Sequence, residues 1–217
     1  MSADWALPAP PTGIVSPRPS GESEQPAGPV EYSWVGQTAR QIGIVAHRLW
    51  GMVAQEGSEH WDAQRIGALA RPTVLMLRER GVPGDELDAA GRRIMSVLRG
   101  VLGDPRGRWV LSGKHQQAHC EYPLSGYLDG RLVHARLDRS FVDADGVCWV
   151  VDYKTGGHEG GDREAFLDQE LTRYLPQLGR YAALVRHMHD GPVCTALYYP
   201  VLQGWREWHP GSPQAVK

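Results

Sequence analysis

Two carboxylates and one ammonium group stand near the middle of the sequence at positions that could support chemistry. Asp152 and Lys154 follow an apolar run, and on a strand their spacing of two residues places both side chains on one face. Counting back from the turn at 143–146 brings Asp138 within a residue or two of a position opposite Asp152. Two unpaired carboxylates this close repel each other and raise one pKa unless a cation or a proton lies between them. A divalent metal beside Lys154 is the simplest solution, and hard oxygen ligands suit Mg²⁺ or Mn²⁺.

A structural role for the same residues is also open. Asp138 could form a half-exposed ion pair with Arg136, Arg139 or Lys154, and an Asp and a Lys two residues apart occur often by chance. Against this, the chain has 20 Arg but only 3 Lys, so a lysine inside a motif is less readily explained by chance. The spacing alone leaves both roles possible.

The elements that must position these side chains follow from hydrophobic periodicity. Apolar residues near 3.6-residue spacing predict helices over 37–55, over 61–80 and from an N-cap at Asp85 to 103. From residue 119 the period changes to two, which predicts three antiparallel strands over 119–128, 131–142 and 147–153, joined by turns that contain Asp and Gly.

A further helix and a further strand complete the expected order. The helix is predicted over 171–188, where Pro176 must lie in the first turn or two or else kink the helix, and the last strand over 193–201. This order predicts an α/β fold with a mixed sheet flanked by helices and an N-terminal helical segment.

Composition sets the domain boundaries and excludes several classes of protein. Residues 1–30 hold seven of the sixteen prolines, so we expect a disordered tail or linker there and one domain over 31–217. The net charge of −2, the lack of a long apolar run and the lack of a leader pattern predict a cytoplasmic protein without a membrane partner. Three scattered cysteines exclude a disulfide framework and a four-cysteine metal site within this chain, and we expect them to be small core residues. Gly113-Lys114 lacks the glycine of a P-loop, which excludes a P-loop ATPase.

Four motifs in one order give the sequence a resemblance to a known family. They are Gly43-Ile-Val-Ala-His47, Arg136-Leu-Asp-Arg139, Trp149-Val-Val-Asp-Tyr-Lys-Thr-Gly156 and Tyr174-Leu-Pro-Gln177-Leu-Gly-Arg-Tyr181. Over about residues 33–202 the chain resembles the RecB-like nuclease domain of the PD-(D/E)XK superfamily, as found at the C-terminal end of AddA-type and UvrD/REP-type helicase–nucleases. Leu137 replaces the proline of the superfamily name, a proline that RecB-like members commonly lack.

The resemblance implies a role for each matching residue. It makes His47, Asp138 and Asp152 ligands of Mg²⁺ or Mn²⁺ and adds the backbone carbonyl of Tyr153. It also makes Lys154 the catalytic lysine beside Asp138 and Asp152. It also implies that Gln177 and Tyr181, which share a helix face, contact DNA or support the site, although packing of Tyr181 against the sheet is nearly as good an explanation. Glu121 resembles an acidic position near the first strand of the meander that could reach the metal through water, or it could be an ordinary strand-edge charge.

The function implied is metal-dependent hydrolysis of DNA. The resemblance implies an exonuclease or endonuclease for single-stranded DNA in double-strand break repair and recombination, with a helicase subunit or domain as partner. Two alternatives remain, a non-catalytic DNA-binding or anchoring module and a nuclease of RNA or of invading DNA. The 11 Arg and 9 acidic residues of segment 31–110 nearly balance, so strong sequence-independent DNA affinity is not expected.

Overall fold

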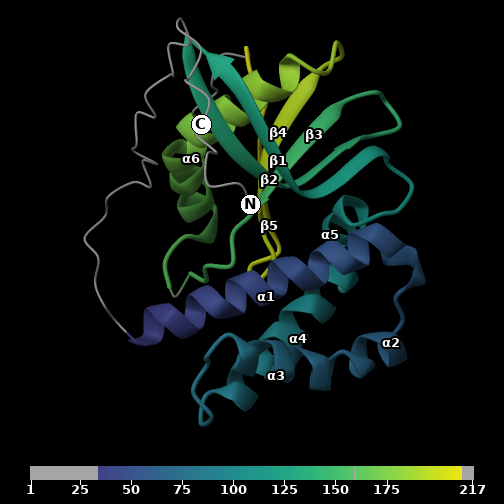
Figure 1. Ribbon diagram of the computed structural model, residues 1–217, viewed down its shortest axis with the longest axis vertical. Helices are drawn as coiled ribbons and strands as arrows, with labels where there is room; N and C mark the ends of the chain where they lie inside the picture. Colours follow the sequence, from purple (N-terminus) through teal and green to yellow (C-terminus); the bar gives the residue numbers. More distant parts are fainter. Residues whose placement is uncertain (1–33, 159, 212–217) are drawn as a thin grey trace, which may run out of the picture. The chain divides into compact units, whose positions relative to one another are not determined.

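A five-stranded mixed sheet forms the centre of the protein, whose computed structural model describes residues 34–158 and 160–211. The strands are β1 Gln116–Leu128, β2 Arg131–Val142, β3 Cys148–Tyr153, β4 Val193–Tyr199 and β5 Gly204–Trp208, in the order β1-β2-β3-β4-β5. All neighbouring pairs are antiparallel except β3 and β4, which are parallel and joined by a helical crossover (Figure 1). The expected α/β fold with a mixed sheet flanked by helices is confirmed. The tail expected over 1–30 lies outside the described residues.

The helices before the sheet differ in detail from the sequence prediction. The structure has α1 Trp34–Glu56, the 3₁₀ turn η1 Ser58–His60, α2 Ala63–Ala68, α3 Ala70–Glu79, α4 Leu87–Gly103 and α5 Pro105–Val110. The helix predicted over 61–80 is divided at Leu69 because Pro72, in the first turn of α3, has no N–H to donate to the preceding turn. Asp85 is not the N-cap of α4; Glu86 is, and it makes no side-chain cap. The short helix α5 was not predicted, although Asp104, whose carboxylate caps its N-terminus, was visible in the sequence.

Helix α6 Arg163–Arg186 starts eight residues before the predicted position. Asp162 caps it by accepting hydrogen bonds from the backbone N–H groups of Glu164 and Ala165. Pro176 therefore lies in the helix interior rather than in its first turns, where it leaves the carbonyl of Thr172 without its usual backbone donor. The prediction failed because the polar first half of α6 lacks the apolar periodicity that marks its second half.

Both faces of the central strand β3 are buried, which explains its unbroken apolar sequence. Trp149, Val151 and Tyr153 point to one face and join the core that α1, α4 and α5 cover. Cys148 and Val150 point to the other face and pack against α6. Figure 1 shows α1 running between the strands on one side and α3 and α4 on the other. This arrangement holds the end of β3 between α1 and α6.

Tight turns fix the register of β1, β2 and β3. Asp129 (φ 50°) and Gly130 (φ 75°) both have the positive φ that a two-residue hairpin turn needs. In the second turn the Asp143 carboxylate accepts backbone hydrogen bonds from Asp145 and Val147, and Gly146 has φ 77°. The two predicted hairpins are confirmed.

The end of the sheet was predicted incompletely. The strand expected over 193–201 stops at Tyr199, and the chain turns back into β5, which pairs with β4 from Thr195 to Tyr199. None of the helices over 34–158 and 160–211 is long and apolar enough to cross a membrane.

Candidate metal centre and active site

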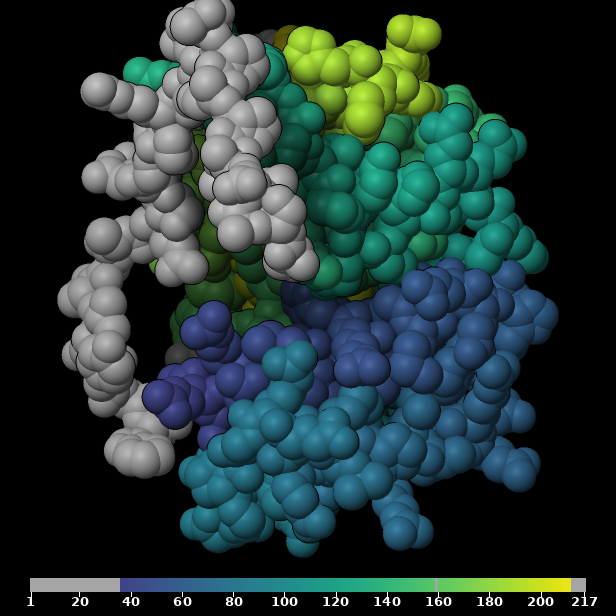
Figure 2. All heavy atoms as spheres, viewed as in Figure 1, coloured from purple at the N-terminus to yellow at the C-terminus, as the bar shows by residue number. Residues whose placement is uncertain are grey.

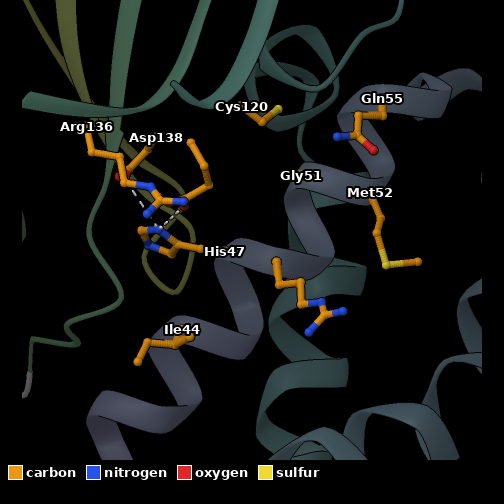
Figure 3. A pocket seen from close by; sticks show the side chains of 10 residues that line it. Ile44, His47, Gly51, Met52, Gln55, Cys120, Arg136 and Asp138 are labelled. Atoms are coloured by element: carbon orange, nitrogen blue, oxygen red, sulfur yellow. Dashed lines mark ion pairs between the residues drawn. The ribbon is translucent and has the colours of Figure 1, made fainter. Parts of the chain in front are cut away.

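A histidine and two carboxylates from three different elements meet at the point where α1 faces the sheet. His47 lies on α1, Glu121 on β1 and Asp138 on β2, and one potential ligand atom from each falls within 4.8 Å of the others. His47 Nδ1 is 3.5 Å from Glu121 Oε1 and 3.5 Å from Asp138 Oδ1 (Figure 3). We refer to His47, Glu121 and Asp138 as the triad.

Strand pairing brings the two triad carboxylates together. Cys120 pairs with Arg139 and Tyr122 pairs with Leu137, so Glu121 lies opposite Asp138. Glu121 has φ 50°, a left-handed conformation that is strained for a residue with a Cβ, at a cost of about 1 kcal/mol or more. Strain of this kind persists only where the surrounding structure holds it.

Asp138 also marks the point where β2 and β3 separate. Their last pair is Arg139 with Val151, and continuing this register places Asp138 opposite Asp152, as the sequence predicted. Instead of a ladder hydrogen bond, the Tyr153 backbone N–H donates to Asp138 Oδ2 over 2.8 Å. One Asp138 oxygen therefore faces His47 and the other faces β3.

Asp152 is held by a lysine and a glutamine rather than by the triad. Lys154 Nζ lies 2.7 Å from Asp152 Oδ2, an ion contact without hydrogen-bond geometry. Gln177 of α6 donates from Nε2 to Asp152 Oδ1 over 2.8 Å and to the hydroxyl of Tyr181, one turn further along, over 2.6 Å. The Lys154 ammonium also lies 3.6 Å from the ring centroid of Tyr174, so aromatic and carboxylate groups together fix its position.

The electrostatics of the site favour a bound cation. Burial and the charge of Asp138 raise the pKa of Asp152 to about 6, although Lys154 and His47 oppose the shift. Burial favours the neutral form of His47, but the surrounding carboxylates, Asp138 and Glu121 foremost, outweigh it and raise its pKa. Without added positive charge these carboxyl groups resist full ionisation. A divalent cation would stabilise their ionised forms.

The donor set fits Mg²⁺ or Mn²⁺. Carboxylate oxygens suit both ions, and an imidazole nitrogen is a better ligand for Mn²⁺ than for Mg²⁺. Ligands about 2.1 Å from an octahedral ion lie roughly 3 Å apart, so the two separations of 3.5 Å from His47 Nδ1, to Glu121 Oε1 and to Asp138 Oδ1, need only a small contraction. The triad would hold such an ion, and Asp152 stands beside it. The roles of Asp152 and of the Tyr153 carbonyl as further ligands stay predictions.

The candidate site residues predicted from the sequence lie close together around the triad and Asp152. Glu121 contacts His47 directly, so the structure gives it more than an ordinary strand-edge position. The ion pair suggested between Asp138 and Arg139 does not form, because Arg139 is buried and donates to the carbonyls of Val110 and Ser112.

Three residues make contacts at or near the site that the sequence did not predict. Arg136 Nε lies 2.8 Å from Glu121 Oε2, and its position two residues before Asp138 on one strand could have indicated a shared face. Tyr174 belongs to the same motif as Gln177, one turn earlier on the helix, but its contact with Lys154 was not predicted. Cys120 was expected in the core, as Cys148 and Cys194 are, but it is half-exposed because it lies at the edge of β1 that faces α1.

Comparison with known proteins decides the family. The PD-(D/E)XK nuclease superfamily matches residues 33–211, a range that holds the triad, Asp152 and Lys154. The chain belongs to this superfamily. The mixed sheet flanked by helices is consistent with the restriction-endonuclease-like fold of PD-(D/E)XK nucleases, and divalent metals serve these nucleases as cofactors.

No curated protein matches the chain. Among solved structures it is similar to protein VC1899 from Vibrio cholerae, with 14% identity over 62% of this chain and a TM-score of 0.21. The matched part spans 43% of the length of that protein.

Proposed function

We propose that this PD-(D/E)XK protein is a Mg²⁺-dependent deoxyribonuclease that hydrolyses phosphodiester bonds of single-stranded DNA. The observation that carries the proposal is the triad of His47, Glu121 and Asp138 next to the Lys154–Asp152 pair. Carboxylates and an imidazole supply the ligands, and a lysine stands where a phosphate would approach them. An anchoring module would have no need for these groups in one place.

Each residue has a defined task in this proposal. When bound, the divalent ion lowers the pKa of a water molecule and neutralises charge on the reacting phosphate. Lys154 orients the attacking water and donates to the phosphate oxygens as their negative charge grows. Gln177 keeps Asp152 in place by donating to Oδ1, which leaves Oδ2 to Lys154.

The resemblance to RecB-like domains supports the rest of the proposal. It suggests a role in double-strand break repair and recombination, with a helicase that supplies the single strand. The charge of −2 agrees with a nuclease that does not hold DNA strongly by itself. We therefore expect slow, weakly salt-sensitive cleavage by the isolated chain and faster cleavage when a helicase raises the local concentration of single strands.

The test is cleavage of end-labelled single- and double-stranded DNA and RNA by the purified chain in Mg²⁺, in Mn²⁺ and in EDTA. We expect single-stranded DNA to be cut with either metal and no cutting in EDTA. Calorimetry should detect Mn²⁺ binding that weakens in Asp138→Ala and in Asp152→Ala. Cleavage of RNA alone, or cleavage that continues in EDTA, would contradict the proposal. Fast, processive degradation by the chain alone would contradict the need for a helicase.

A further inference from the structure

A cavity of about 500 Å³ opens beside the triad, between α1 and β1. His47 and Asp138 form one part of its lining, and Arg48, Met52 and Cys120 are among its other lining residues (Figure 3). Figure 2 shows the face on which the blue helix α1 meets the teal strands β1 and β2. A cavity of this size accommodates a small organic ligand.

One side of the cavity is a stripe along α1. Its lining residues recur every three or four positions from Ile44 through Arg48 and Gly51 to Gln55, so they share one helix face. Gly51 lies directly across from Cys120 on the opposite wall, since a Cβ there would be 3.8 Å from the Cβ of Cys120, an ordinary van der Waals contact. The stripe thus leads away from the triad while α1 and β1 remain near each other.

The lining of the cavity combines a positive charge, apolar surface and an amide. Arg48 is exposed and makes no ion pair with any residue over 34–158 and 160–211, so its guanidinium is available to an anion. Met52 and Cys120 are half-buried and offer polarizable, apolar surface. Gln55 is exposed and carries an amide that can both donate and accept hydrogen bonds.

We propose that this cavity is a subsite for the nucleotide next to the scissile phosphodiester. Arg48 binds the phosphate of that nucleotide, and Met52 and Cys120 contact its base. This inference rests on the proposed function, because it places the reacting phosphate at the triad. The base must leave any stack to enter the cavity, at a cost of a few kcal/mol in a duplex and little in a single strand. The subsite therefore selects an unpaired nucleotide.

Cys120 gives a direct probe of occupancy, because Cys148 and Cys194 are buried. The intact chain is treated with iodoacetamide in EDTA, with and without a ten-nucleotide single strand or the matching duplex, and labelling of Cys120 is followed by peptide mass spectrometry. Fluorescence anisotropy of the same single strand gives its Kd. At about ten times Kd, we expect the single strand to slow labelling about tenfold and the duplex to have little effect.

A matched pair of arginine variants tests the role of Arg48. Arg48→Ala should weaken single-strand binding roughly tenfold or more, because a charge-assisted contact to phosphate is lost. Arg92→Ala makes the same change of charge at an exposed position of α4 outside the cavity lining, and we expect binding to be unchanged.

Several results would overturn the inference. They are equal protection of Cys120 by the duplex, binding of the single strand without protection, and a Cys120 that does not react in the free chain, which would mean a closed cavity. If the chain cuts DNA but Arg48→Ala has an unchanged KM and Kd, the subsite is wrong and the nuclease proposal stands. If the single strand protects Cys120 but nothing is ever cut, the cavity still binds an unpaired nucleotide, whereas the nuclease proposal fails and with it the place of the cavity next to a scissile bond.

Discussion

The buried negative charge of Asp152 destabilises the fold at neutral pH, and its removal should raise the free energy of unfolding. The side chain is only 5% exposed at the end of β3, and its carboxylate has one ion contact with Lys154 and one hydrogen bond from Gln177. Replacing it by asparagine keeps the shape and the acceptor for Gln177 but removes the charge. We expect Asp152→Asn to stabilise the fold at neutral pH and to abolish cleavage.

The magnitude follows from the proton affinity of the carboxyl group. Burial first, and then the charge of Asp138, raise the pKa of Asp152 from 3.8 to about 6. Below about pH 4 the group is protonated in both the folded and the unfolded chain, and its ionisation affects neither. As the pH rises toward 6, the unfolded chain releases the proton first, so the fold loses stability. Above pH 6 the group is ionised in both states, so the free energy of unfolding falls no further on its account. The pKa of Asp152 differs by about two units between the folded and the unfolded chain, which corresponds to about 3 kcal/mol.

Thermal unfolding in EDTA at pH 4.5 and pH 7.5 measures this cost. For a domain of this size we expect Asp152→Asn to raise the Tm by about 6–12 °C at pH 7.5 and by much less at pH 4.5. Asp85→Asn, which removes a carboxylate from an exposed position, is the control and should change the Tm little at either pH. A Tm of Asp152→Asn that equals or falls below that of the unmodified chain at pH 7.5 would refute this reasoning.

Three further substitutions separate chemistry from folding. Lys154→Ala should abolish cleavage, and at pH 4.5, where the carboxyl group of Asp152 is protonated in the folded chain, it should shift the Tm by only a few degrees because no unpaired buried charge is left; a chain that no longer folds at this pH would favour a structural ion pair. Glu121→Asn should weaken Mn²⁺ binding in calorimetry and leave the stability unchanged, since asparagine tolerates a positive φ. An unaltered affinity for Mn²⁺ would mean that Glu121 is not a ligand. Gly107→Ala should lower the free energy of unfolding by about 1–3 kcal/mol in urea, because the new Cβ collides with the carbonyl oxygen of Val101 and the hydroxyl of Tyr198; tolerance of this change would contradict the tight packing of α5.

The sequence predicted the part of the fold that local patterns determine. Alternation and the turns at Asp129-Gly130 and at 143–146 define the β1–β2–β3 meander and its register, and this register places Asp138 opposite Asp152. The short strand β5 and the polar half of α6 have no comparable periodicity. Their positions depend on tertiary contacts, such as those of Arg206 in β5 with Asp168 of α6, 2.6 Å away, and with Glu164.

The site was predictable as a group of residues but not as a geometry. The resemblance to RecB-like domains implies that His47 and Asp138 belong together, and the structure shows His47 Nδ1 and Asp138 Oδ1 3.5 Å apart. No local pattern reveals that Glu121 turns toward His47, because this requires a positive φ within β1. The cavity along α1 is equally non-local, since β1 forms its opposite wall only after the sheet packs on the helix.

The position of a bound metal ion shows whether the triad is a metal site. Crystals of the protein soaked in Mn²⁺ would be examined for anomalous scattering at the manganese absorption edge. We expect one strong peak within about 2.3 Å of His47 Nδ1 and of the carboxylate oxygens of Glu121 and Asp138. A peak elsewhere on the protein, or no ordered manganese at concentrations that support cleavage, would contradict it.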